Sequence, residues 1–476
     1  MGEEGVRCTV GNVIHHVKFF SLCSPVDSMA RAPMQGIKTC TGYYGCNWCL
    51  HPGIYVEFGD KGAVKFPVLD DVPNRTEAQT IRDMEQSLTS VEPVNGIKRP
   101  SCLINLRFFN IIWGFVPDYM HALCLGIAKY FMERWLSMLS PRDRLRLDSL
   151  IEGIRVPNHL QRLSRSIGDR KHWKSREWEN WLLYYSLPIL RSFPQLEHVA
   201  THWALLVEGF YILMQSSITR AQVNDAHNLL REFVLRTELL YGKACMTFNV
   251  HQLLHLAQSV LDWGPLWAHS CYCFESFNSI VLKEIHSAKG VIHQVCRSVS
   301  MRQSELLLRR HVGLNEHSSM IEYVEYLDCK RAQKTVRLAN QRYFGKYRNP
   351  GQNIIDRLNL TEHARLYYRM VKDGCLYTAN SNRSKRTDNS YAQTVNGDYI
   401  QIKKFIVDEY TNESFTECTV WRVRPASLDR YSPTVILVDI IQRVAFYNPN
   451  DIKTICVCIK IDDITYLTPL PNLHRN

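Results

Sequence analysis

Residues 42–51 read GYYGCNWCLH and hold a Cys-x-x-Cys motif. The two thiolates of Cys46 and Cys49 are three residues apart and can bind the same tetrahedral zinc ion, while Gly45 relaxes the turn that directs both sulfurs inward. A structural zinc ion takes four protein ligands. The fold therefore has to bring a second pair of ligands to this turn from another part of the chain.

The second pair is expected in residues 249–255, which read NVHQLLH. His251 and His255 stand at positions i and i+4, which share one face of a helix and can hold one metal ion. Without a metal, Cys46 and Cys49 would be two buried thiols, and a thioredoxin-type redox pair fits poorly because no helix clearly begins at Cys46. Nearer alternatives as ligands are Cys40, His51, His121 and Cys124.

The composition is that of a globular protein with several domains. The chain has 476 residues, of which 45% are hydrophobic and 22% are charged. At about 150 residues per domain, this length suggests two to four domains. The formal net charge of +11 suits an acidic partner such as nucleic acid, although solubility alone explains it equally well.

Neither a secretory signal nor a membrane span is expected. The first residues are acidic and lack an apolar segment. Lys129 and Asp439 interrupt the longest apolar stretches, none of which approaches the roughly 18 residues that a span needs. The 16 cysteines are therefore expected to be reduced thiols rather than a disulfide framework.

The hydrophobic pattern predicts an α/β part, a helical body and a β module. Residues 17–23 have the pattern of a strand, a helix is expected from Ser28, and residues 53–68 alternate around Gly-Asp-Lys-Gly as a hairpin. Apolar residues at three-to-four spacing predict helices over 76–90, 119–139, 142–154, 177–192, 202–216 and 221–241. Short strands over 399–402, 419–423, 434–438 and 455–459 predict a small β-barrel or sandwich.

Five segments follow from this pattern. We expect an α/β core with the Cys-x-x-Cys half-site over 1–74, a helical insertion over 75–262, core helices over 263–311, a linker region over 312–390 and a small β domain over 391–476. The linker region is polar, carries Tyr–Arg clusters and ends near a basic stretch at 380–386.

Asp118 and His121 begin one of the predicted helices, directly after Pro117. Asp118 fits the N-cap of this helix, where the backbone N–H groups favour a carboxylate. The functional alternative places His121 near the metal or near DNA.

Asp27 and Glu275 are the candidate catalytic acids. Asp27 follows the first predicted strand, where α/β sheets often place their chemistry. Glu275 stands between aromatic residues at an expected buried helix start, which is a costly position for a carboxylate unless it is paired or binds a metal. Together they could hold divalent cations, but two-metal phosphoryl chemistry needs at least three such groups.

At these motifs the sequence resembles the CACTA (En/Spm, Tnp2-like) DDE transposases. The resemblance covers roughly residues 5–310, and the later β segment is similar to the C-terminal module of that family. It rests on several motifs in the same order as in the family: Asp27, GYYGCNWCLHPG at 42–53, VPDYMH at 116–121, GPLWAH at 264–269 and FESFN at 274–278.

The resemblance implies a nuclear, DNA-binding protein with an RNase H-like core that a helical insertion interrupts. Three acids of that core would bind two Mg²⁺ ions, with Asp27 as the second acid and Glu275 as the last. Cys46, Cys49, His251 and His255 match zinc ligands that join the insertion to the core, and Asp118 and His121 match an Asp-x-x-His signature.

One departure from the family pattern matters most. Only 26 residues precede Asp27, and their acids, Glu3 and Glu4, lie in no strand pattern. We therefore expect the first acid, the opening strands and an N-terminal DNA-binding domain to be absent from this chain. Removing one member of a catalytic unit usually abolishes most of its activity, so this chain should not cut DNA unaided.

Three hypotheses remain at this stage. The first is a transposase-derived protein that binds DNA or protein without catalysis, and the second is an active transposase completed by a partner chain or upstream sequence. The third is a zinc-stabilised protein-interaction scaffold. A homo-oligomer is compatible with each of them. For DNA contact we expect Lys283, Lys289 and Arg297 on one helical run, with a solvated helix face as the alternative.

Overall fold

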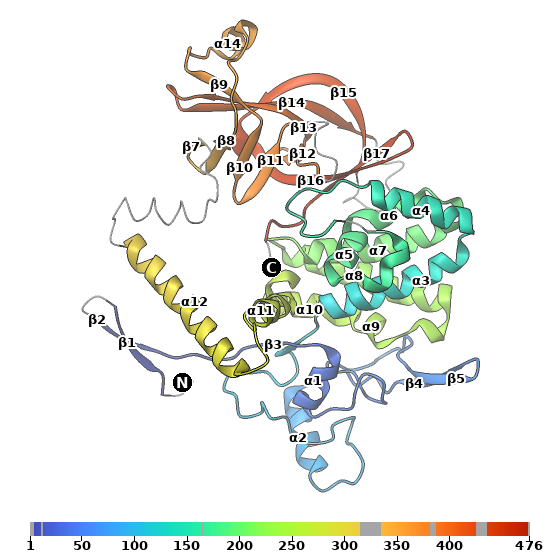
Figure 1. The fold of residues 1–476 in the computed structure, drawn as a ribbon. Helices are drawn as coiled ribbons and strands as arrows, with labels where there is room; N and C mark the ends of the chain where they lie inside the picture. The colour runs from blue at the N-terminus through green and yellow to red at the C-terminus, as the bar shows by residue number, and fades with distance from the viewer. Residues whose placement is uncertain are drawn as a thin grey trace.

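The structure is a computed structural model that describes residues 4–10, 13–163, 165–314, 335–380, 387–424 and 436–474. It confirms a mixed α/β chain with several sheets. In Figure 1 a helical body lies between a small N-terminal part below and a β module above. Within the described ranges, no helix combines the length and apolar character that crossing a membrane would require.

The N-terminal part contains three small two-stranded sheets. Strand β3 pairs with β6 in parallel, whereas the other two sheets are antiparallel hairpins. The hairpin predicted within 53–68 is confirmed. The elements are β1 (Val6–Val10), β2 (Val13–Val17), β3 (Ser24–Pro25), α1 (Ser28–Gln35), β4 (Ile54–Phe58), β5 (Lys61–Lys65), α2 (Glu77–Ser87) and β6 (Phe115–Val116).

The predicted strand over 17–23 is wrong. Residues 18–23 form no strand, and only the short β3 follows them. Phe19 is 59% exposed, and Phe20 packs its ring edge-on against Phe108 instead of entering a sheet. An apolar run becomes a buried strand only where neighbouring strands supply hydrogen bonds, and β3 has such a neighbour only at Ser24 and Pro25.

The six predicted helices over 76–241 are confirmed. Side chains that precede several of them cap the first turn, as Thr76, Ser140 and Thr219 do. The helices are η1 (Met120–Ala128, a π-helical segment) continuing into α3 (Lys129–Met138), α4 (Pro141–Gly153), α5 (Ser175–Asn180), η3 (Trp181–Tyr185), α6 (Ser186–Arg191), α7 (Glu197–Leu213), α8 (Arg220–Tyr241), α9 (Phe248–His251) and α10 (Leu253–Trp263).

Aromatic side chains form the centre of the helical body. Trp203 is fully buried, packs edge-on against Trp135 with ring centroids 4.7 Å apart, and donates its indole N–H to Ser186 Oγ at 2.9 Å. Trp173, Trp178 and Trp181 are also buried. Burial of such large rings is a main source of stability for the body.

Two helices follow the helical body, α11 (Tyr272–Lys283) and α12 (Val291–Leu314). The prediction of one helical run that carries Lys283, Lys289 and Arg297 is wrong, because α11 ends at Lys283 and Lys289 lies in the connection. Gly290, directly before α12, has a φ of +66°, a left-handed conformation that favours glycine and separates the two helices. In Figure 1, α12 projects away from the helical body.

The β module is larger than the predicted domain over 391–476. Its main sheet has the order β12-β16-β17-β15-β14-β13-β9, and a further pairing between β12 and β13 closes six of these strands into a ring. A second sheet has the order β11-β10-β8-β7. The strands are β7 (Thr335–Leu338), β8 (Gln341–Phe344), β9 (Ala364–Tyr367), β10 (Arg369–Lys372), β11 (Cys375–Thr378), β12 (Tyr391–Thr394), β13 (Tyr399–Asp408), β14 (Glu413–Val423), β15 (Ile436–Tyr447), β16 (Ile452–Ile461) and β17 (Ile464–Pro469), with helix α14 (Gln352–Leu358) between β8 and β9.

The prediction of a linker over 312–390 is therefore wrong for residues 335–380. Tyr343, Met370 and Tyr377 from this range are buried, because the Tyr–Arg clusters alternate inward aromatic with outward basic residues along short strands. The basic stretch at 381–386 lies outside the described residues. The module packs on the helical body, where Tyr211 donates its hydroxyl to the carbonyl of Pro469 at 3.0 Å.

Replacing Trp203 with alanine should lower the free energy of unfolding by about 3–5 kcal/mol, because it opens a cavity between α7, α3 and α6. Tyr410→Ala is the control, since Tyr410 is 74% exposed and its loss should change stability by less than about 0.5 kcal/mol. Urea denaturation followed by far-UV circular dichroism measures both. Equal effects of the two substitutions would contradict the assignment of Trp203 to the core.

Candidate metal centre and the adjoining acidic cluster

The four predicted zinc ligands meet at one point inside the protein. Cys46 Sγ lies 3.4 Å from His255 Nε2, Cys49 Sγ lies 3.3 Å from His251 Nε2, and the two Nε2 atoms are 3.4 Å apart. All four ligand atoms lie within 4.8 Å of one another, and all four residues are buried. The paired residues are 209 and 202 positions apart in the sequence.

These distances fit a tetrahedral zinc ion. With Zn–S bonds of about 2.3 Å and Zn–N bonds of about 2.05 Å, tetrahedral angles place sulfur about 3.6 Å from nitrogen and the two nitrogens about 3.3 Å apart. The observed separations of 3.3–3.4 Å agree with both values to within about 0.3 Å. Two thiols and two imidazoles are also the ligand set of many structural zinc sites, so the residues present fit this ion.

Local sequence places each pair of ligands. A Cβ atom on Gly45 would lie 2.4 Å from the carbonyl oxygen of Thr39, so only glycine permits this tight turn before Cys46. The histidines belong to successive helices, because His251 ends α9 and His255 lies in the first turn of α10. The predicted spacing of i and i+4 still brings both imidazoles to one side.

The electrostatics of the buried pair favour one thiolate before any metal binds. Burial alone would raise the pKa of Cys46, but the hydrogen bond from Cys49 and the nearby His255 and His251 lower it well below its ordinary value. The pKa of Cys49 is raised, because it keeps the shared proton and is itself buried. A Zn²⁺ ion would displace this remaining proton, since the thiolate is the form that binds metal.

The other candidate ligands lie outside the cluster. His51 Nδ1 accepts the N–H of Gly53 at 2.9 Å, and its Nε2 bonds the carbonyl of Pro67 at 2.7 Å, so both ring nitrogens are occupied. The His51 ring instead packs 5.0 Å from that of His251. Neither Cys40, His121 nor Cys124 belongs to this group of ligands.

A cavity of about 460 Å³ adjoins the metal centre. Cys49, His251 and His255 line one side of it, and His227 and Arg231 from α8 line another. The sequence analysis did not anticipate this cavity, because its walls come from segments that only the fold brings together. Solvent and small chelators can therefore approach the centre from this side.

Two buried arginines flank the Cys-x-x-Cys turn, and the sequence analysis missed both. Arg75 donates from Nε to the carbonyl of Cys46 at 3.0 Å and from Nη2 to the carbonyls of Tyr44 and Asn95 at 3.1 and 2.9 Å. Arg31, on α1, lies over the ring of Trp48 with its guanidinium carbon 4.4 Å from the ring centroid. No local pattern marks an arginine for burial, so the sequence carries no signal that would have found them.

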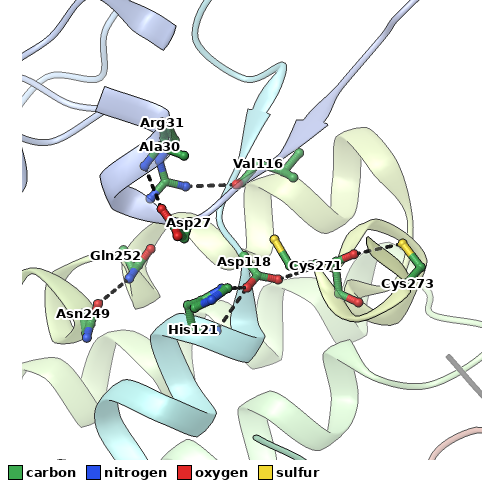
Figure 2. A network of polar contacts seen from close by, with 11 residues as sticks. Asp27, Ala30, Arg31, Val116, Asp118, His121, Asn249, Gln252, Cys271 and Cys273 are labelled. Atoms are coloured by element: carbon green, nitrogen blue, oxygen red, sulfur yellow. Dashed lines mark hydrogen bonds and ion pairs between the residues drawn. The ribbon is translucent and has the colours of Figure 1, made fainter. Parts of the chain in front are cut away.

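Asp118 joins the start of η1 to the start of α11, as Figure 2 shows. Its Oδ2 accepts the N–H of His121 at 3.0 Å and lies 2.7 Å from His121 Nδ1. Its Oδ1 accepts the N–H of Cys271 at 2.8 Å, 153 residues away in sequence. The predicted cap is thus confirmed, and it also fixes the start of α11. The adjoining π-helical η1 is of a type found frequently at functional sites.

The same cluster brings Asp27 and Glu275 into electrostatic reach of His121. The hydrogen bond to Asp118 raises the pKa of His121, and the charges of Asp27 and Glu275 add to this shift. Burial raises the pKa of the Cys271 thiol, and the charges of Asp118, Asp27 and Glu275 raise it further. Two acids from distant parts of the sequence therefore surround the same pair of groups.

The two acids differ in their surroundings. Asp27 is the N-cap of α1, where its Oδ1 accepts the N–H of Ala30 at 2.7 Å. Glu275 lies in the first turn of α11 and is exposed, so its predicted burial is wrong. Phe274 and Phe277 beside it are also more than half exposed, because only the first residue of α11, Tyr272, is buried in the body.

The group of Asp118, His121 and Cys271 has the spacing of a second metal site, but its chemistry argues against one. Three hydrogen bonds already occupy both oxygens of Asp118. The raised pKa of Cys271 also disfavours the thiolate that a metal would need. This group is better described as a hydrogen-bonded junction.

The predicted DNA contacts, Lys283, Lys289 and Arg297, are all exposed. They lie on α11, in the connection and on α12, so they follow a protruding part of the chain rather than one helix face.

Comparison with known proteins adds no relative. The chain matches none of the models of known protein families, and no curated protein is significantly similar to it.

We expect about one zinc ion per chain, the stoichiometry of a single four-ligand site. Cys46→Ser or His255→Asn should abolish zinc binding, because three ligands of this set hold zinc far more weakly than four. Cys40→Ser is the matched control and should keep the zinc. Elemental analysis of the parent and of each variant, purified without chelators, measures the zinc content per chain. Zinc-free parent protein would contradict the assignment.

His121 should make stability depend on pH. The pKa of His121 is raised above the ordinary 6.5 in the folded state. The protonated His121 therefore stabilises the folded protein fully below pH 6.5, and this stabilisation is lost as the pH rises through the raised pKa. The melting temperature of His121→Gln should therefore fall below that of the parent near pH 6 and approach it near pH 9. The exposed His198 provides the control, His198→Gln, for which we expect a constant difference across this range. A constant difference for His121→Gln would refute the role given to its charge.

Proposed function

We propose that this protein derives from a CACTA-type DDE transposase and keeps a zinc-stabilised body that binds DNA in the nucleus without cleaving it unaided. The observation that carries the proposal is that Asp27 and Asp118 follow neighbouring parallel strands, while the N–H of Cys271, at the start of the helix that carries Glu275, bonds Asp118.

The parallel pair of β3 and β6 supports a partial RNase H-like core. Asp27 lies two residues beyond β3, and Asp118 lies two residues beyond β6. Both acids thus follow the carboxyl ends of neighbouring parallel strands, which is where α/β sheets place their active sites. The bond from Cys271 to Asp118 brings the start of α11, and with it Glu275, to the same edge.

The acid set of this chain supports binding more than cleavage. Asp27 and Glu275 are the residues that would hold Mg²⁺, which would polarise a phosphate and activate the attacking group. A pair of such ions needs at least three carboxylates. Asp118 is the third carboxylate of this cluster, but its oxygens are already bonded to His121 and Cys271. The incomplete acid set is the reason for proposing binding without cleavage.

A second candidate function is an active transposase that a further acid completes. The observation in its favour is that, within the described residues, neither Asp27 nor Glu275 forms an ion pair. Carboxylates that no basic side chain neutralises can accept a divalent cation. A partner chain that supplies one acid would then restore the set.

The test is duplex DNA binding and cleavage in one reaction. We expect the parent to bind duplex DNA, with an affinity that falls steeply with salt, and to leave it intact with Mg²⁺ or Mn²⁺. Changing Lys283, Lys289 and Arg297 together to glutamine should lower the slope of log K against log salt by about 0.9 for each phosphate that the variant no longer neutralises. Changing Lys61, Lys98 and Lys243, which are exposed elsewhere, to glutamine is the control with the same loss of charge.

The possible results separate the three hypotheses. Cleavage by the parent that Glu275→Gln abolishes would replace the first candidate with the second. Absence of binding even at low salt would reject both and leave the interaction scaffold. Equal effects of the two triple variants would reject Lys283, Lys289 and Arg297 as the contact surface.

A further inference from the structure

Arg31 is a buried cation that lies between the metal centre and the acidic cluster. Its side chain belongs to α1 and is 1% exposed. Nη1 donates to the carbonyl of Val116 at 3.0 Å, and the guanidinium stacks over Trp48. Figure 2 shows the bond to Val116 with Asp27 close by. A planar guanidinium suits such a position, because it can stack on a ring and donate sideways at the same time.

Trp48 connects Arg31 to the metal ligands. It lies between Cys46 and Cys49 in the sequence, and its indole N–H donates to the carbonyl of Phe115 at 2.8 Å. Trp48 and Arg31 therefore bond successive carbonyls of strand β6, at Phe115 and Val116. A movement of the Cys-x-x-Cys turn has to displace this stacked pair or break a buried hydrogen bond.

The same helix connects Arg31 to Asp27. The N–H of Arg31 donates to the carbonyl of Asp27 at 2.9 Å, and the Asp27 carboxylate caps the first turn through Ala30. Because Arg31 fixes this first turn against β6, it also fixes the backbone of Asp27. One continuous set of contacts thus runs from the metal ligands through Trp48 and Arg31 to the acid.

The charge of Arg31 also depends on the metal centre and on the acidic cluster. A buried cation is costly unless negative groups compensate it. Burial lowers the pKa of Arg31 to about 10, and the charges of Cys46 and Asp118 oppose this shift. The guanidinium therefore stays charged at neutral pH.

We propose that Arg31 is a positioning residue that couples occupancy of the metal centre to the placement of Asp27. The inference rests on the zinc centre proposed above. With zinc bound, the 46–49 turn is rigid, Trp48 is held against β6, and Arg31 keeps the first turn of α1 in place. Without zinc, the turn can move and α1 loses this support. Coupling of this kind is reciprocal, so a change at Arg31 also weakens zinc retention.

Arg75 provides a matched control for this inference. It is a second buried arginine that supports the same turn, through the carbonyls of Cys46 and Tyr44. Its remaining bond goes to Asn95, outside α1. A change at Arg75 should therefore weaken the metal centre without acting directly on Asp27.

The experiment measures hydrogen exchange of peptides that cover residues 24–36 in the full chain, with saturating zinc and after removal by a chelator. We expect exchange in the parent to be at least about tenfold faster without zinc. In Arg31→Met, exchange of the same peptides should be fast both with saturating zinc and without zinc. In Arg75→Met the zinc affinity should fall, while exchange with saturating zinc stays at the parent level.

Each result supports or overturns the inference. Parent exchange that is indifferent to zinc, or Arg31→Met exchange that still responds to zinc as in the parent, would overturn it while leaving the metal centre intact. A parent that binds no zinc would instead overturn the metal centre itself. If circular dichroism shows that Arg31→Met does not fold, Arg31→Lys decides the question, because it keeps the charge but removes the planar stack. If hydrogen exchange in Arg31→Lys still responds to zinc as strongly as in the parent, the role of Arg31 is rejected.

Discussion

The fold depends on four ligand side chains that converge from two distant segments. The turn at Cys46 and Cys49 meets His251 and His255 across more than 200 residues of intervening chain. Closing so long a loop has an entropic cost that rises only slowly with length, so one strong site can offset it. A bound metal would contribute its binding free energy directly to folding, because the unfolded chain has no preformed site. Most of the helical body lies between these two segments of the chain.

A second junction holds the same parts together without a metal. Asp118 bonds the start of η1 through His121 and the start of α11 through Cys271. Gly126 allows η1 to approach α9, since a Cβ atom there would lie 2.3 Å from the Asn249 side chain. A buried and fully bonded carboxylate specifies one arrangement, because any shift leaves costly unpaired groups. Metal centre and acidic cluster are therefore parts of one rigid region.

Much of this region could be predicted from local patterns, and the exceptions have physical causes. Helices over 76–241, the hairpin at 53–68 and the pairing of Cys46 and Cys49 with His251 and His255 follow from periodicity and spacing. The strand expected at 17–23 failed because an apolar run is not a strand without neighbours. The burial expected for Glu275 failed because α11 leaves the body after its first residue, Tyr272. The linker expected at 312–390 failed over 335–380, because short strands there alternate buried with less buried side chains, as Gln341, Arg342 and Tyr343 do.

The sequence by itself determined most helices of the body and a short set of candidate metal ligands, with Cys46, Cys49, His251 and His255 as the preferred four. Both depend on residues close together in the chain, such as a capping threonine or two histidines four positions apart. Only the tertiary structure decided that His51 is excluded from the centre, that Cys271 bonds Asp118, and that Arg31 and Arg75 are buried beside the Cys-x-x-Cys turn. These outcomes depend on packing between segments far apart in the sequence, and no local pattern encodes which of many compatible partners a side chain will meet.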